Sequence, residues 1–239
     1  MNRYFEKVYK TTKFLPPNFA ATLDLMRPSL SASWGGPLNG QQRRRQIVRD
    51  ITNAITFDRV LETGTFRGTS TEFFASVFGV PVNTVEADER FFSYSSRRLS
   101  PLPEITVDFA DSRQFLRAQA NRPGAGSETV YVYLDAHWAE DLPLADELRI
   151  VSDSWERAVV MIDDFQVPND EGYAFDDYGP GKALVEGLLP ASALAGWFLH
   201  YPAAESSLET GAKRGSCVLS SPAIGPLTDI TTLRLARKL

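Results

Sequence analysis

Three carboxylates follow two strongly apolar stretches of the chain. Asp135 closes the run TVYVYLDA at 129–136, and Asp163 with Asp164 closes the run RAVVMIDDF at 157–165. Both runs have the composition of buried central strands, so the acids are expected at the carboxyl edge of a sheet. If the two strands are neighbours, about 4.8 Å apart, three hard oxygen donors surround one point. Such a cluster suits Mg²⁺.

The same cluster has alternative explanations. Clustered carboxylates repel one another, so a metal or another positive group is expected beside them. Alternatively, Asp135 serves catalysis or a cofactor alone, while Asp163 and Asp164 cap a loop. The chain has two histidines and one cysteine, which argues against a zinc site.

His137 follows Asp135 by two residues and is a candidate general base. It could accept a proton from an acceptor hydroxyl whose pKa a metal has lowered. The alternative is a structural histidine packed under Trp138 with both ring nitrogens satisfied.

The segment LETGTFRGTS at 61–70 is a candidate ligand loop. Gly64 and Gly68 allow a sharp turn and a close approach of a ligand. Thr69, Ser70 and the amides of the following helical turn can donate hydrogen bonds. The spacing is G-x-x-x-G and no Lys-Ser/Thr pair follows, which disfavours dinucleotide and nucleoside-triphosphate sites.

Two further acids end predicted strands. Glu86 ends VNTVEA, where a carboxylate can accept both hydroxyls of a ribose; the alternative is an exposed strand end. Asp111 follows the next strand and can reach an adenine edge; the alternative is a helix N-cap.

Strands and helices alternate around these residues. Strands are expected at 58–63, 82–87, 104–110, 129–136, 157–165, 196–203 and 215–221. Helices are expected at 41–56, 70–79, 88–99, from Asp111 or Ser112 onward, and at 142–154 and 181–189. This order predicts an α/β fold with a doubly wound, mostly parallel, seven-stranded sheet. The last two strands have no helix between them and are expected as an antiparallel edge pair.

The chain is expected to divide into an extension and a single domain. Residues 1–40 are rich in Pro, Ser, Asn and Gly, which predicts an irregular N-terminal extension that could supply a wall of a substrate pocket. Residues 41–239 are the expected domain. The run QQRRRQ at 41–46 opens a helical pattern and is interpreted as a solvated helix face.

The ordered set VLETGTFRGTST, TVEADE, FADS and YLDAHW resembles the class I S-adenosylmethionine-dependent methyltransferases over about residues 58–220. The acid pattern is similar to the metal-dependent macrocin O-methyltransferase and cephalosporin-hydroxylase-like branch. This resemblance implies a Rossmann-like fold, S-adenosylmethionine, and Mg²⁺ on Asp135, Asp163 and Asp164. It also implies cofactor contacts from Glu62, Gly64, Thr65, Gly68, Thr69, Ser70, Glu86, Asp111, Ser112 and Asp135. His137 and Asp135 are the implied catalytic residues.

Two later segments complete the prediction. The loop 166–180 is long enough to cover a pocket with Tyr173, Phe175 and Tyr178, and its acids Asp176 and Asp177 are expected to be solvated. The phrase LETGAKRG at 208–215 repeats most of LETGTFRG, but it runs into a strand rather than a helix. It is expected to be a turn with Lys213 and Arg214 at an exposed tip.

Composition limits the partners. The net charge of −5 argues against nucleic acid, and no apolar run is long enough to span a membrane. A cytoplasmic protein with a small-molecule acceptor is expected, and assembly into a homo-oligomer stays open.

The leading hypothesis is a Mg²⁺-dependent O-methyltransferase acting on a hydroxyl of a sugar or a natural-product phenol. The alternatives are a metal-independent N- or C-methyltransferase, a metal-dependent hydrolase or hydroxylase-like enzyme, and a binding protein that keeps the fold without turnover.

Overall fold

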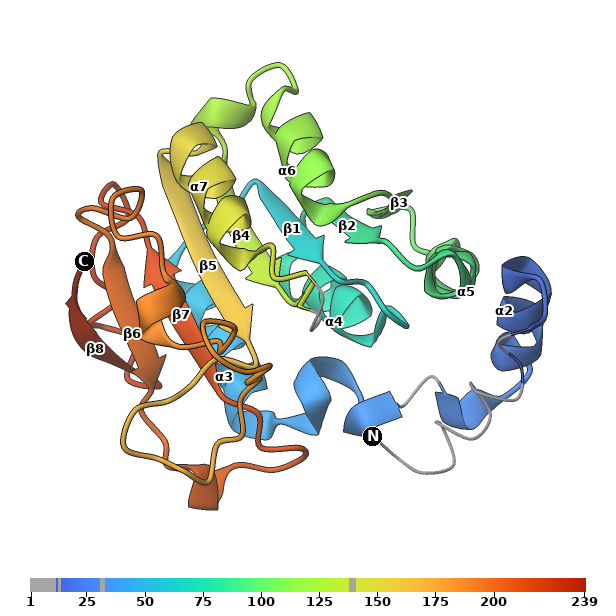
Figure 1. Ribbon diagram of the computed structural model, residues 1–239. Helices are drawn as coiled ribbons and strands as arrows, with labels where there is room; N and C mark the ends of the chain where they lie inside the picture. Colours follow the sequence, from blue (N-terminus) through green and yellow to red (C-terminus); the bar gives the residue numbers. More distant parts are fainter. Residues whose placement is uncertain (1–11, 13, 31–32, 138–140) are drawn as a thin grey trace.

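A central sheet of eight strands, in the order β3-β2-β1-β4-β5-β7-β6-β8, organises the molecule (Figure 1). The computed structural model describes residues 12, 14–30, 33–137 and 141–239. The strands are β1 (Arg59–Thr63), β2 (Val82–Glu86), β3 (Ile105–Phe109), β4 (Thr129–Leu134), β5 (Arg157–Asp163), β6 (Phe198–Pro202), β7 (Ser216–Ser220) and β8 (Leu233–Lys238). Strands β3, β2, β1, β4 and β5 pair in parallel, and β7 is antiparallel to both of its neighbours.

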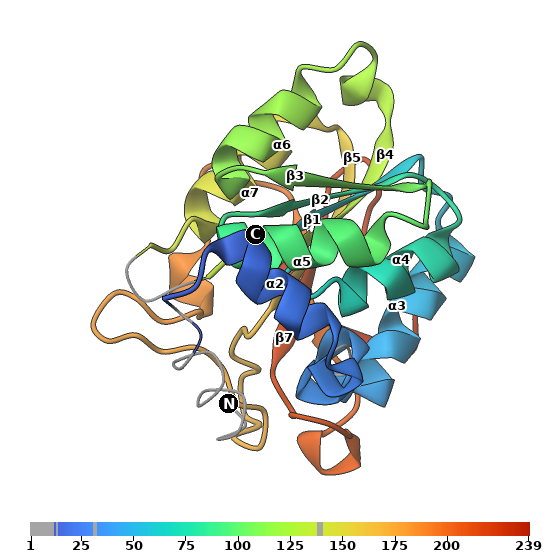
Figure 2. The ribbon, with the colours of Figure 1, turned by 90° about the vertical axis from the view of Figure 1, so that its right-hand side faces the viewer.

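Helices cover both faces of the sheet. They are α2 (Pro17–Leu25), α3 (Gln42–Ala54), α4 (Thr69–Phe78), α5 (Glu89–Leu99), α6 (Ser112–Ala120) and α7 (Leu144–Ser154). Short 3₁₀ turns are η1 (Pro28–Leu30), η2 (Ser33–Gly35), η3 (Pro37–Gly40), η4 (Ala125–Ser127), η5 (Glu186–Leu188) and η6 (Ser206–Leu208). Figure 2 shows α6 and α7 on one face and α3, α4 and α5 on the other. The doubly wound prediction is confirmed.

Side-chain alternation along the central strand β4 builds two separate cores. Val130 and Val132 pack with α6 and α7, whereas Tyr131 and Tyr133 pack with α3 and α4. All of these side chains are buried because both faces of a parallel sheet are covered by helices. Tyr133 therefore approaches the carboxyl edge of the sheet from the α3 side.

The strand register brings the predicted acids together. Thr63 of β1 pairs with Leu134 of β4, and Leu134 pairs with Ile162 of β5. Asp135 and Asp163 thus lie at the ends of adjacent strands, which meets the condition on which the predicted acidic cluster depended.

The N-terminal extension is more regular than expected. Helix α2 packs along α5 (Figure 2), and the carboxylate of Asp24 accepts hydrogen bonds from Arg90 at 2.8 and 2.7 Å. Asp24 is almost fully buried, so this ion pair fixes α2 to the domain. The composition of residues 1–40 concealed a helix that begins at a proline, a residue well suited to a first helical turn.

Two other expectations are wrong in detail. The sheet has an eighth strand, β8, whose sequence LRLARK lies at the edge with most side chains exposed, so it carries no apolar run. The helix expected at 181–189 is only the turn η5, because Gly187 and Pro190 interrupt it. The antiparallel pairing of β6 with β7 is confirmed. None of the helices in the described residues is long and apolar enough to cross a membrane.

Candidate functional site

The turn after β1 brings the backbones of two strand ends into contact. Gly64 has a φ of 87°, and a Cβ atom there would lie 2.6 Å from the carbonyl oxygen of Asp135. Glycine tolerates both this backbone and this approach. The amides of Gly64 and Thr65 each donate to the carbonyl of Val85 over 3.0 Å. Packing among β1, β2 and β4 therefore requires the glycine whether or not a ligand binds.

Glu62 and Thr65 face neighbouring elements. The hydroxyl of Thr71 donates to Glu62 over 2.5 Å, and burial raises the pKa of Glu62 to about 7. The hydroxyls of Thr65 and Thr84 lie 2.6 Å apart. Both side chains thus fix the turn to α4 and β2.

The start of α4 holds the N-terminal extension. Gly68 adopts a φ of 73° just before the helix, and a Cβ atom there would lie 2.6 Å from the side chain of Leu99. The Ser70 hydroxyl accepts a hydrogen bond from the amide of Leu38 over 3.1 Å. Thr69 is half-buried beside it. The first turn of α4 therefore lies under the 3₁₀ turn η3.

Glu86 connects the glycine turn to the start of α5. Its two carboxylate oxygens accept hydrogen bonds from the amide of Phe66 at 2.7 Å and from the amide of Asp88 at 2.9 Å. Burial raises its pKa to about 7. A carboxylate has about four acceptor sites, so Glu86 can still accept from a diol. The alternative of an exposed strand end is wrong.

Asp111 is the N-cap of α6. It accepts from the amides of Arg113 at 2.9 Å and Gln114 at 3.3 Å, and from the Arg113 guanidinium at 2.6 Å. The hydrogen bond from Arg113 lowers the pKa of Asp111. The capping alternative is confirmed, and a contact of Asp111 with adenine stays a prediction.

A buried carboxylate that the sequence did not reveal lies behind this helix start. Glu147 on α7 is fully buried near the hydroxyls of Ser112 and Thr63, and burial raises its pKa to about 7. Neither of its oxygens makes a hydrogen bond of good geometry with the described residues. Within α7 it occupies an ordinary helical position, so no sequence signal marks it.

Asp163 is saturated by protein donors. It accepts hydrogen bonds from Tyr133 at 2.5 Å, Asn39 at 3.1 Å, the amide of Asp164 at 2.7 Å, and the guanidinium of Arg44. Both of its oxygens are used twice, and the residue is almost fully buried. This filled coordination leaves no lone pair for another ligand.

The arginine that pairs with Asp163 comes from the start of α3. Arg44 is 1% exposed. The prediction that QQRRRQ forms a solvated face is therefore wrong for Arg44, although its neighbours Gln42 and Arg43 are exposed. Helical periodicity turns one arginine of the run toward the sheet while the flanking residues face solvent.

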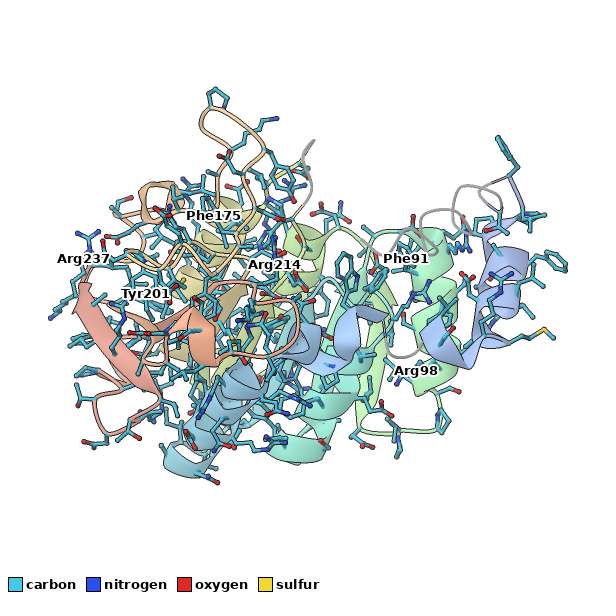
Figure 3. The ribbon with its side chains drawn as sticks, turned by 90° about the horizontal axis from the view of Figure 1, so that it is seen from below. Phe91, Arg98, Phe175, Tyr201, Arg214 and Arg237 are labelled. Atoms are coloured by element: carbon cyan, nitrogen blue, oxygen red, sulfur yellow. The ribbon has the colours of Figure 1, made fainter. Side chains whose placement is uncertain are left out.

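Arg214 compensates the second acid. Its Nε donates to Asp164 over 2.5 Å, and its Nη2 contacts Asp176. The expectation that Arg214 lies at an exposed tip is wrong, as is the expectation of a solvated Asp176. Figure 3 shows Arg214 near Phe175, where the loop after β5 meets the β6–β7 connection. The amide of Gly215 donates to the carbonyl of Ala174 there over 2.7 Å.

The carboxyl group of Asp135 lies close to these pairs and makes no hydrogen bond or ion pair with another described residue. Burial and the charges of Asp163 and Asp164 raise its pKa well above the usual range. A neutral carboxyl at this edge can donate as well as accept a hydrogen bond.

These residues do not fit Mg²⁺ as they are arranged. The ion binds oxygen lone pairs that are open to it, but Asp163 is saturated and Asp164 is paired with Arg214. Across the described part of the chain, no group of three or more His, Cys, Asp or Glu residues is arranged to hold a metal ion.

His137 is a buried imidazole beside this centre. Neither ring nitrogen makes a hydrogen bond of good geometry with the described residues. Burial lowers its pKa to about 4, so the ring is neutral near pH 7. The hydroxyl of Tyr178 lies 3.4 Å from the His137 carbonyl oxygen, which brings the loop after β5 over the site. Trp138, the packing partner considered from the sequence, lies outside the described residues.

Tyr173 does not cover the site. It is buried in the core on the α7 face, and its hydroxyl donates to the carbonyl of Ala204 over 3.1 Å. Of the three aromatic residues expected in the cover, Phe175 and Tyr178 are half-buried.

The comparisons with solved structures decide the fold family. An O-methyltransferase from Bacillus cereus in complex with SAH has a TM-score of 0.57 at 16% identity, covering 89% of this chain and 95% of its own. The O-methyltransferase TomG from Streptomyces achromogenes, in complex with SAM, has a TM-score of 0.51 at 15% identity, covering 92% and 99%. This protein has the class I S-adenosylmethionine-dependent methyltransferase fold. No family model matches the sequence, and no curated protein matches it.

Within this methyltransferase fold, the glycine turn and the acids after β2 and β3 lie along one sheet edge. Phe66 and Thr69 remain partly exposed there, and Glu86 has acceptor capacity left. The residues present therefore fit an adenosine-containing cofactor placed beyond the carboxyl ends of the strands, where open parallel sheets bind ligands.

Proposed function

We propose that this protein transfers the methyl group of S-adenosylmethionine to a hydroxyl oxygen of a small molecule. The observation that carries the proposal is His137, which lies just after β4: it is a neutral, buried imidazole whose two nitrogens make no hydrogen bond of good geometry with the described residues. Gly64 contacts the backbone of Asp135, which precedes His137 by two residues. A cofactor bound at the glycine turn would therefore lie next to this base.

S-adenosylmethionine, when bound, supplies a methyl carbon activated by its sulfonium, and S-adenosylhomocysteine is the leaving product. His137 accepts the proton of the acceptor hydroxyl as the new carbon–oxygen bond forms. Asp135 can hold the acceptor by a hydrogen bond. Tyr178 and the loop after β5 cover His137 and exclude water. Orientation of the two reactants supplies the remainder of the rate enhancement.

The magnesium ion expected from the sequence is not part of this mechanism, because Asp163 and Asp164 are paired with arginines. The narrower resemblance to the macrocin O-methyltransferase and cephalosporin-hydroxylase-like branch therefore stays a prediction. The same pairing disfavours a hydrolase that depends on metal at these acids. It is compatible with a metal-independent N-methyltransferase, since an uncharged amine nitrogen can attack the methyl carbon without a metal ion.

The first test is cofactor binding, measured by calorimetry with S-adenosylmethionine and S-adenosylhomocysteine. We expect one site per chain. Absence of binding to either molecule would rule out the proposal.

The second test assigns the base. His137→Gln should reduce kcat by about 10²-fold or more, while the dissociation constant for S-adenosylmethionine changes little. Activity is followed by S-adenosylhomocysteine release with panels of sugar, phenol and amine acceptors. Full activity of the variant would exclude His137 as the base. Turnover with amines alone would show that the acceptor group is an amine and not a hydroxyl.

A further inference from the structure

The acidic edge of the sheet needs positive charge to be stable. Asp135, Asp163 and Asp164 lie together, and Asp176 of the following loop joins them through Arg214. Buried carboxylates at this spacing destabilise one another unless a cation is close. A divalent metal ion could supply this charge, whereas here two guanidinium groups lie against the carboxylates.

The position of Arg44 is fixed by a cap on helix α3 that comes from a segment far away in the sequence. The carboxylate of Glu209 accepts hydrogen bonds from the amides of Arg43 at 2.9 Å and Arg44 at 3.0 Å. The hydroxyl of Thr210 accepts from the amide of Gln42 over 2.9 Å. This cap fixes the first turn of α3, from which the Arg44 side chain reaches Asp163 and, over 3.0 Å, the carbonyl of Gly215.

Arg214 is fixed from the same two segments. The side chain of Gln41 donates to the Arg214 carbonyl over 2.9 Å and accepts from its amide over 2.6 Å. Arg44 also donates to the Arg214 carbonyl. The backbone of Arg214 is thus clamped, and its guanidinium is held between Asp164 and Asp176.

The segment LETGAKRG at 208–215 therefore holds helix α3 and the acids together. Its Glu209 and Thr210 cap α3, and its Arg214 reaches the acids. Gly211 has a φ of 64°, and a Cβ atom there would lie 2.2 Å from the carbonyl oxygen of Asn39. Together with Gln41 and Arg44, this segment forms a clamp around the end of β5, which we call the arginine clamp (residues 41–44 and 209–215).

We propose that Arg44 and Arg214 are the permanent cations of this centre and take the place of a divalent metal, so that the protein binds no metal ion at its acidic edge. Arginine stays charged at all physiological pH values, and its planar N–H groups match carboxylate oxygens. A dication entering the same space would meet two fixed positive charges and no open lone pairs on Asp163. The inference does not depend on methyl transfer.

The experiment uses metal binding rather than activity. Mn²⁺ is titrated into the wild-type protein and followed by its electron paramagnetic resonance signal. We expect no stoichiometric uptake up to millimolar Mn²⁺. Uptake of one ion per chain that Asp163→Asn abolishes would overturn the proposal.

A second measurement uses the melting temperature with and without Mg²⁺. Arg214→Gln leaves Asp164 and Asp176 uncompensated, and Arg214 is 24% exposed, so this variant is a better choice than a change at the buried Arg44. We expect millimolar Mg²⁺ to raise the melting temperature of Arg214→Gln by several degrees and to leave the wild type and the neighbouring control Lys213→Gln unchanged. An equal response in all three proteins would overturn the proposal.

Discussion

At the scale of single residues, the same chemical group serves different purposes according to what surrounds it. Glu62, Glu86 and Glu147 are buried carboxyls whose pKa is raised to about 7 by burial. Glu62 and Glu86 have hydroxyl or amide donors, whereas Glu147 has no well-formed hydrogen bond among the described residues. Of these three carboxyls, Glu147 therefore has the least stabilisation of its charged form by hydrogen bonds.

Glu147 should make stability depend on pH. Its folded-state pKa is raised from 4.5 to about 7, so its contribution is fully present below about pH 4.5 and is lost as pH rises through 7. Glu147→Gln cannot ionise at this position. Its free energy of unfolding relative to wild type should therefore be about 2 kcal/mol greater at pH 8 than at pH 5. Urea unfolding at both pH values measures this difference. The comparison removes the parallel effects of Glu62 and Glu86, and a constant difference across the range would show that Glu147 does not titrate as described.

Gly64 should be intolerant of any side chain. A Cβ atom would lie 2.6 Å from the Asp135 carbonyl, in a backbone with φ of 87°. Gly64→Ala should lose several kcal/mol of stability, about 1–2 kcal/mol from the left-handed backbone and the rest from the clash. Gly79→Ala is the matched control, because Gly79 has a φ of 65° with nothing within 4 Å of the added Cβ. Equal losses in thermal unfolding would contradict the close approach.

At the scale of elements, the N-terminal caps of the helices fix the side chains that lie at the sheet edge. Helices α5 and α6 begin at local aspartate caps, Asp88 and Asp111, where the sequence predicted the two helices to start. Helix α3 is capped instead by Glu209, from the far end of the chain. A local sequence pattern cannot predict such a cap, because the capping residue is not near the helix in the sequence.

Glu209→Gln should loosen α3 and move Arg44. The loss of a charged cap should cost about 1–2 kcal/mol, more than an average exposed substitution. Glu205→Gln, a change of the same kind at an exposed position of the same connection, should cost less than about 0.5 kcal/mol. Denaturant midpoints compare the two, and hydrogen exchange of the Arg43 and Arg44 amides should accelerate in the first variant alone. Similar costs in both variants would argue against the cap.

At the scale of the whole molecule, segments from both ends of the chain converge on one sheet edge. Asn39 donates to Asp163, and its carbonyl accepts from the amide of Ala212 over 3.0 Å. The extension and the β6–β7 connection thus close over the end of β5. A pocket wall supplied by residues 1–40 stays a prediction. Figure 1 shows the blue N-terminal segment running beneath this edge toward α2.

Helix α2 should detach when its buried ion pair is broken. Asp24→Asn leaves the Arg90 guanidinium without its carboxylate, and breaking a buried pair costs about 3–5 kcal/mol. Because α2 contacts mainly α5, we expect faster chymotryptic cleavage at Phe19 of α2, with a smaller change in overall melting. Glu72→Gln removes the partially exposed partner of Arg98 and should cost less than about 1 kcal/mol. Unchanged proteolysis of Asp24→Asn would show that other contacts hold α2.

The sequence by itself determined the alternation of strands and helices, the doubly wound sheet, the glycine turn after β1 and the position of Asp135 and Asp163 at strand ends. Each of these follows from short-range patterns of apolar, glycine and capping residues. Only the tertiary structure decided what neutralises the acids. From the sequence, the arginine run is expected to be solvated and the second LETG segment is expected to be a turn. In the folded protein, residues 41–44 lie beside residues 209–215 and their arginines pair with the acids. Charge compensation depends on such long-range contacts, and a residue's type cannot show whether its partner is water, a metal ion or an arginine from the other end of the chain.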